Sequence, residues 1–156
     1  MATTTTTDRK VFVTNRIART LRQSGLGLTP GSTVSETAVR TACRAIAEKR
    51  TRAVYAGVAS APSGAYVAVG GFCSMPEGRV FWASRIRGTD RVHIQSDHRV
   101  NSTFTTASRD ELHDGAIHVS DRDRGALLDS LESTYDADLA RREAGLLRAC
   151  GLEVRA

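Results

Sequence analysis

The chain has 156 residues, of which 40% are hydrophobic and 25% are charged. This length is enough for one domain with a hydrophobic core of its own. No apolar run approaches the roughly 18 residues that cross a bilayer, and the first ten residues, MATTTTTDRK, lack the apolar segment of a secretory signal. We therefore expect a cytoplasmic protein that makes no contact with a membrane.

The net charge of +5 is unevenly distributed along the chain. Residues 1–52 have a net charge of +7, residues 53–106 of +2 and residues 107–156 of −4. The basic end could face an anionic partner or the acidic end of a neighbouring subunit. Because 20 of the 22 basic residues are arginine, a usage that often reflects genomic base composition, the number of arginines alone does not indicate phosphate binding.

The residue types that usually carry catalysis form no clear pattern. Cys43, Cys73 and Cys150 are widely spaced and have apolar neighbours, which predicts buried thiols rather than a disulfide framework. The four histidines form two pairs with a spacing of five residues, which places the members of each pair on different sides of a helix or strand. The chain has no GxSxG, GxGxxG or P-loop motif. We expect no metal site and identify no catalytic residue, so whether the protein is an enzyme stays open.

The first elements are predicted from the N-terminal end. Residues 1–8 form a threonine-rich tract that cannot bury enough apolar surface to become ordered, and residues 9–156 are predicted to form a single α+β domain. Residues 10–14 indicate a short strand. A helix is expected to follow, capped by Asn15 and ended by Gly25.

A second helix is predicted from a capping box over residues 33–36, in which a threonine hydroxyl and a glutamate carboxylate satisfy each other's backbone donors. The helix should extend to about Lys49, because apolar residues recur at a spacing of four along one side. The residues of this apolar stripe are Val34, Ala38, Ala42 and Ile46.

The central stretch from residue 52 to residue 88 predicts three antiparallel strands joined by two tight turns. The strands are expected over residues 52–61, 65–75 and 79–88, and the turns at Pro62-Ser63-Gly64 and Pro76-Glu77-Gly78. The residues that alternate along these strands are apolar on both faces, so both faces of the sheet must be covered. This favours a β-meander that closes into a small barrel, with a helix or a second subunit outside it.

Shorter elements are predicted beyond Gly88. They are a strand or short helix over residues 91–95, strands over 101–106 and 116–120, a helix from residue 120 or 121, a second helical segment from about residue 136 that ends at Gly151, and an edge strand over 152–154.

One polar cluster lies at the end of the third predicted strand and in the turn after it. Its members are Ser84, Arg85, Arg87, Thr89 and Arg91. Guanidinium groups offer paired donors that suit a phosphate, and threonine adds a short neutral donor. The cluster therefore predicts a site for a phosphate-bearing ligand, although a solvated strand end in an arginine-rich protein would look the same. Gly70-Gly71 indicates a bulge or a close backbone approach.

Residues 37–103 resemble the FMN-binding split-barrel family, also described as pyridoxamine-phosphate-oxidase-like. The segment RVFWASRIRGTDRV, residues 79–92, is similar to the third strand and the phosphate-contacting turn of that family. Residues 97–100, Asp-His-Arg-Val, are similar to the motif that closes the following helix. In this chain Arg91 replaces the usual lysine, and His98 stands where proline is typical.

The resemblance implies a split barrel with flanking N- and C-terminal helices and a small oxidoreductase that depends on FMN or a deazaflavin. It implies that Arg85, Arg87 and Arg91 hold the FMN phosphate and that backbone near Gly70-Gly71 approaches the flavin ring. It also implies a homodimer with the flavin at the subunit interface. The substrate and the redox partner are not indicated.

Two further functions are consistent with the sequence. A non-enzymatic module could hold nucleic acid or another anion with its basic N-terminal third, and binding would then weaken steeply with salt. The basic residues concerned are Arg16, Arg19, Arg22, Arg40, Arg44, Lys49, Arg50 and Arg52. Alternatively, the opposite charges of the two ends could mediate self-association of a structural subunit.

Overall fold

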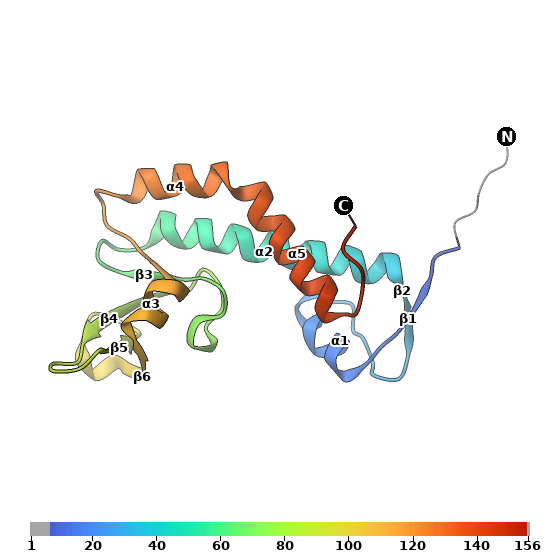
Figure 1. Cartoon of the computed structure of the whole chain (residues 1–156), viewed down its shortest axis with the longest axis horizontal. Coiled ribbons are helices and arrows are strands. Elements are labelled where there is room, and N and C mark those ends of the chain that lie inside the picture. The colour runs from blue at the N-terminus through green and yellow to red at the C-terminus, as the bar shows by residue number, and fades with distance from the viewer. Residues whose placement is uncertain (1–6, 156) are drawn as a thin grey trace. The chain divides into compact units, whose positions relative to one another are not determined.

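The computed structural model in Figure 1 describes residues 7–155 and combines helices with antiparallel strands. The α+β class is therefore confirmed. The described residues form two compact units, which we call unit 1 (residues 7–49 and 136–155) and unit 2 (residues 50–135). Residues 1–6 of the predicted threonine-rich tail lie outside the described part of the chain, and the single domain over residues 9–156 stays a prediction. Within residues 7–155, no helix is long and apolar enough to cross a membrane.

Unit 1 combines a two-stranded sheet with helices. Its elements are β1 (Lys10–Phe12), α1 (Asn15–Thr20), β2 (Thr33–Ser35), the first part of α2 (Glu36–Ser60) and almost all of α5 (Tyr135–Ala149). Strands β1 and β2 pair antiparallel. Gly25 and Gly151 adopt positive φ angles of 76° and 74° after their helical segments, as expected for glycine at a helix end.

Helix caps in unit 1 differ from the predicted ones by one or two residues. The cap of α1 is Thr14, whose Oγ1 accepts a hydrogen bond of 3.2 Å from the backbone N–H of Ile17, rather than Asn15. The capping box over residues 33–36 does not form, because Thr33 to Ser35 are part of β2. Helix α2 instead begins at Glu36, and the Asp8 carboxylate accepts a hydrogen bond from the backbone N–H of Thr37. Asp8, which the sequence placed in the tail, is thus hydrogen-bonded.

The predicted strand over residues 52–61 is wrong, because α2 continues to Ser60. This stretch is rich in alanine, the best helix former, and no proline interrupts it before Pro62. Its buried residues Val54, Val58 and Ala61 recur at helical spacing. The same residues also alternate with small apolar ones, which is why the sequence pattern resembled a buried strand.

Unit 2 contains a five-stranded antiparallel sheet with the strand order β6-β5-β4-β3-β7. Its strands are β3 (Tyr66–Ala68), β4 (Val80–Arg85), β5 (Arg91–Gln95), β6 (Thr103–Ser108) and β7 (Ala116–His118). Its helices are the last part of α2, α3 (Arg109–Gly115) and α4 (Arg124–Ser133).

Most of the strands expected after residue 62 are present, with changed lengths. The second of the three central strands is much shorter than predicted, because Gly70 and Gly71 have φ angles of 65° and 77° and lead into a 3-10 turn. This glycine pair therefore lies after β3 rather than in a bulge inside it. Residues 91–95 form a strand, and the edge strand over 152–154 does not form.

Both faces of the sheet are covered at β3 and β4, as the apolar alternation of these strands predicted. Phe81 and Ile94 belong to one hydrophobic cluster, which also contains Leu112 of α3. Val67 belongs to a second cluster with Val58 of α2, against which leucines of α4 pack. Figure 1 shows α4 beside the C-terminal part of α2. The cover on both sides comes from helices of this chain.

Helix α2 approaches the β3–β4 turn so closely that only glycine fits. A Cβ atom added to Gly57 would lie 2.5 Å from the carbonyl oxygen of Gly78, and one added to Gly78 would overlap the carbonyl of Ala53. Gly78 also has a φ of 86°, which other residues rarely adopt. The contact therefore joins the helix backbone directly to the turn that begins β4.

Replacement of Gly57 by alanine should destabilise the protein by about 1–3 kcal/mol, because the added methyl group must displace backbone rather than a flexible side chain. The matched control is Gly125→Ala in α4, where a Cβ meets nothing within 4 Å. That variant should gain about 0.5–1 kcal/mol from helix propensity. Urea unfolding followed by circular dichroism measures both, and equal stability of the two variants would contradict this account.

The turn between β5 and β6 is organised by Asp97. Its carboxylate accepts hydrogen bonds of 2.7 Å from the backbone N–H of Arg99 and 2.9 Å from the Arg99 guanidinium. These bonds lower the pKa of Asp97 to about 2, the guanidinium making the largest contribution. The Arg99 carbonyl in turn accepts a hydrogen bond from the buried amide of Gln95.

We expect Asp97→Asn to be less stable than the wild type at neutral pH. Because the pKa of Asp97 is lowered in the folded state, its stabilising effect is complete above the ordinary pKa of 3.8 and is lost as the pH falls through about 2. The difference in thermal midpoint should therefore shrink towards pH 2. Asp129→Asn, an exposed position on α4, is the control, and a difference that is independent of pH would refute the assignment.

Candidate anion-binding pocket

A pocket of about 390 Å³ lies between one face of the five-stranded sheet and α3. We call it the basic pocket, after the cationic and aromatic side chains that line it. These are Tyr66 of β3, Arg85 of β4, Arg109 and His113 of α3, and His118 of β7. The pocket is in the size range of small-molecule sites, which span about 300–1,000 Å³.

Strand register brings the sheet residues of the pocket together. Tyr66 pairs with Phe81 on one side and with His118 on the other, and the Tyr66 and His118 rings are 4.8 Å apart. Arg85 lies opposite Val92, a member of the buried cluster on the same face. Since directly opposed residues share a face of the sheet, these side chains all point towards α3.

Helix α3 supplies the other side of the basic pocket. Ser108 and Glu111 form a capping box: the Ser108 hydroxyl accepts from the Glu111 N–H at 3.1 Å, and the Glu111 carboxylate accepts from the Ser108 N–H at 2.7 Å. Arg109 and His113 are four residues apart and so lie on the same side of the helix. Leu112 is buried against the sheet cluster.

The electrostatics of the basic pocket favour an anion. None of its lining residues is acidic. The nearby Glu111 carboxylate is engaged by the cap, and the hydrogen bond from the Ser108 backbone lowers the pKa of Glu111. No partner for Arg85 or for the side chain of Arg109 is found among residues 7–155, so both guanidinium groups can bind a ligand. Two arginines and two histidines together suit a phosphate or a carboxylate.

The structure brings three of the five predicted site residues together. Arg85, Arg87 and Thr89 line one open hollow of about 660 Å³ at the exposed β4–β5 loop, and Arg85 also lines the basic pocket. The Thr89 hydroxyl donates to the Ile86 carbonyl at 2.9 Å and accepts from the Arg91 N–H, so it is used within the turn.

Arg91 lies on the opposite face of the sheet from Arg85. It precedes Val92, which is paired with Arg85, and its guanidinium donates a hydrogen bond of 2.9 Å to the Thr106 hydroxyl. Successive residues of a strand point to opposite faces. Of the three arginines that the resemblance assigned to one phosphate, Arg91 is therefore separated from Arg85 and Arg87, which line one hollow.

Ser84 borders the basic pocket, but its side chain lies on the other face, directly opposite His93. The hydroxyl of Ser84 and Nδ1 of His93 are both buried and have no hydrogen-bond partner within the described part of the chain.

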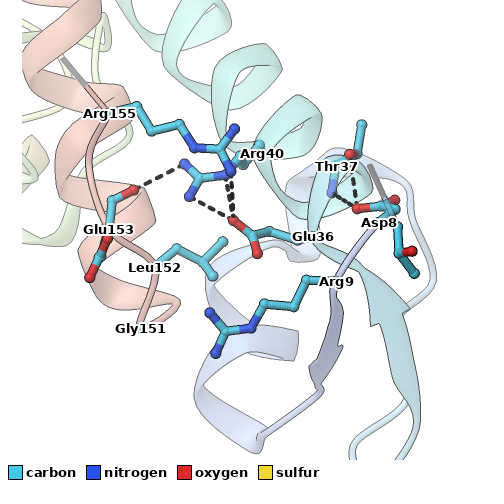
Figure 2. A pocket seen from close by; sticks show the side chains of 10 residues that line it. Asp8, Arg9, Glu36, Thr37, Arg40, Gly151, Leu152, Glu153 and Arg155 are labelled. Carbon is cyan, nitrogen blue, oxygen red and sulfur yellow. Dashed lines mark hydrogen bonds and ion pairs between the residues drawn. The ribbon is translucent and has the colours of Figure 1, made fainter. Parts of the chain in front are cut away.

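A larger hollow of about 630 Å³ in unit 1 is lined by both signs of charge (Figure 2). The buried Glu36 carboxylate forms ion pairs with Arg40 at 2.7 Å and with Arg155 at 3.4 Å. Arg40 also donates a hydrogen bond to the Glu153 carbonyl. These groups neutralise one another, so this hollow is a weaker candidate for ligand binding than the basic pocket.

Part of the basic N-terminal third is also neutralised by ion pairs. Arg40 is paired with Glu36, and Arg44 forms ion pairs with Glu48 at 3.2 Å and with Glu143 at 3.0 Å. The hydrogen bonds that Arg44 donates to these two carboxylates raise its pKa, and the bond to Glu143 makes the largest contribution. The cationic surface available to nucleic acid is therefore smaller than the count of basic residues indicated.

Comparisons with protein-family models, curated proteins and solved structures find no match to this chain. Within residues 7–155, no group of three or more histidine, cysteine or acidic side chains is arranged to hold a metal ion. The site is therefore interpreted from its own geometry.

Replacement of Ser108 by alanine should cost about 1 kcal/mol of stability, because it removes the cap of α3. It should also loosen Arg109 and His113, which α3 holds over the basic pocket. Ser108→Asp keeps an N-cap acceptor and should remain within about 0.5 kcal/mol of the wild type. Urea unfolding measures both variants, and equal losses of stability would show that the cap is not the cause.

Proposed function

We propose that this protein binds a small phosphate-bearing molecule in the basic pocket. The observation that supports the proposal is the convergence of Arg85 and Arg109 on a cavity that also contains His113 and His118 and has no acidic lining residue. Charge-assisted hydrogen bonds to a phosphate are roughly twice as strong as neutral ones.

FMN is the first ligand to test, because the sequence resembles a family that binds it. The three arginines Arg85, Arg87 and Arg91 cannot all bind one FMN phosphate within one chain, since Arg85 and Arg91 lie on opposite faces of the sheet. Arg85 and Arg109 fit better, since both line the basic pocket. We therefore propose that these two arginines bind the phosphate of the ligand, and we assign no redox step to the chain's residues.

Closure into a split barrel and formation of a homodimer are parts of the same proposal. Strands β6 and β7 each pair with one strand of the sheet, so both edges offer unpaired backbone groups. Such edges are usually covered in the native assembly. The exposed Phe104 on β6, at 48% exposure, would be buried if a second copy paired along this edge.

Titration with FMN, riboflavin and inorganic phosphate, followed by calorimetry, tests the proposal. FMN should bind more tightly than riboflavin, which lacks the phosphate. Arg85→Ala and Arg109→Ala should each weaken FMN binding by about 10- to 100-fold, as expected for one charge-assisted hydrogen bond. Arg87→Ala, in the exposed loop outside the pocket, is the matched control and should leave affinity within about twofold.

Three outcomes would count against this function. Absence of binding by all three probes would refute it, as would loss of FMN affinity in Arg87→Ala alone. Binding of a random duplex at low salt, abolished as salt rises, would instead favour the nucleic-acid alternative.

A further inference from the structure

Two of the three cysteines lie next to each other in unit 1. Cys43 is on α2, and Cys150 directly follows α5. The two thiols lie close enough to interact with each other. Both residues are buried, Cys43 completely and Cys150 to all but 5%. They are 107 positions apart in the sequence, so only the fold brings the two sulfur atoms together.

Contacts on both sides of the cysteines join α2 to α5 and to the C-terminal segment that follows α5. Arg40, three residues before Cys43, donates a hydrogen bond of 3.0 Å to the carbonyl of Glu153, three residues after Cys150. Figure 2 shows this contact beside Leu152 and Glu36. Arg44, the residue after Cys43, forms its ion pair of 3.0 Å with Glu143 of α5. These two contacts join α2 to α5 and the C-terminal segment on either side of the cysteines, independently of the interaction between the thiols.

The surroundings make the two thiols unequal. The hydrogen bond with Cys43 lowers the pKa of Cys150, and the positive charge of Arg16 adds to this effect. The pKa of Cys43 is raised, first by the same hydrogen bond and then by burial. Cys150 also keeps an exposed fraction of 5%, against 0% for Cys43, so it is the sulfur that an oxidant would reach first.

We propose that Cys43 and Cys150 form a reversible disulfide that links α2 to the C-terminal segment of unit 1. The oxidant is a low-molecular-weight disulfide. The Cys150 thiolate attacks one of its sulfur atoms, forms a mixed disulfide and releases one thiolate. The Cys43 thiol loses its proton and attacks Sγ of Cys150, and the second thiolate leaves. The protein loses two protons and two electrons, and the oxidant is reduced to two thiols.

The bond would stabilise the folded state of unit 1. A disulfide restricts the unfolded chain, and the restriction grows with the number of residues in the closed loop. Residues 43–150 form a long loop, whereas the folded structure already brings the two cysteines close to each other. Cys73 is separate from this pair, because it lies in unit 2, is half-buried and has no sulfur partner among residues 7–155.

Equilibration of the purified protein with oxidised glutathione under native conditions tests the proposal. Intact mass spectrometry should show the loss of two hydrogen atoms, and digestion without reductant should give one linked peptide pair containing Cys43 and Cys150. Dithiothreitol should restore the original mass. The oxidised protein should unfold at a higher urea concentration than the reduced protein.

Matched variants distinguish the pair from the third cysteine. Cys73→Ser should still lose two hydrogen atoms, whereas Cys43→Ser should stop at the mixed disulfide on Cys150 and gain one glutathione. If Cys43→Ser fails to fold, Cys43→Ala serves in its place, and peptide mapping of the wild type decides alone if both fail. A disulfide that contains Cys73, or no loss of hydrogen after equilibration, would overturn the proposal.

Discussion

The close contact between α2 and the β3–β4 turn is the constraint on which unit 2 depends. Gly57 and Gly78 allow two backbone segments to approach more closely than any side chain would permit. The turn that contains Gly78 leads directly into β4, the central strand of the sheet. The helix therefore fixes where β4 begins, and the pairing with β4 then fixes β5 and β3. The strain caused by a methyl group at this contact would be transmitted to the sheet, because close-packed interiors transmit strain.

The basic pocket follows from the same sheet. Arg85 comes from the end of β4, while Tyr66 and His118 come from β3 and β7 on its other side. Helix α3 is held over them by Leu112 in the core and by a capping box at its start. At the end of α3, a side chain on Gly115 would overlap the ring of Phe72, so this helix also packs closely through a glycine. A rigid scaffold of this kind can present cationic side chains to a ligand with little reorganisation.

Arginine is the commonest charged residue of this chain, yet its roles differ from place to place. Arg40 and Arg44 form ion pairs, Arg91 binds a neighbouring hydroxyl, and Arg87 lies in an exposed loop. Arg85 and Arg109 line a cavity without a carboxylate. A guanidinium beside a carboxylate has its charge compensated, whereas one in a cavity without a carboxylate can bind an anion. Position relative to acidic groups, rather than abundance, therefore separates candidate ligand-binding arginines from structural ones.

The sequence by itself determined the α+β class, the strand at residues 80–85, the positions of Gly25 and Gly151 at helix ends, and the need to cover both faces of the central strands. These features depend on local propensity and on apolar alternation, which are readable over a few residues. It did not determine that residues 52–60 continue a helix, because small apolar residues satisfy strand and helix patterns equally well.

Only the tertiary structure decided which cationic side chains share a face: strand register separates Arg91 from Arg85 and adds His118, and packing of α3 adds Arg109. Cys43 and Cys150 meet for the same reason, since contacts between residues far apart in the chain arise from packing and leave no local pattern.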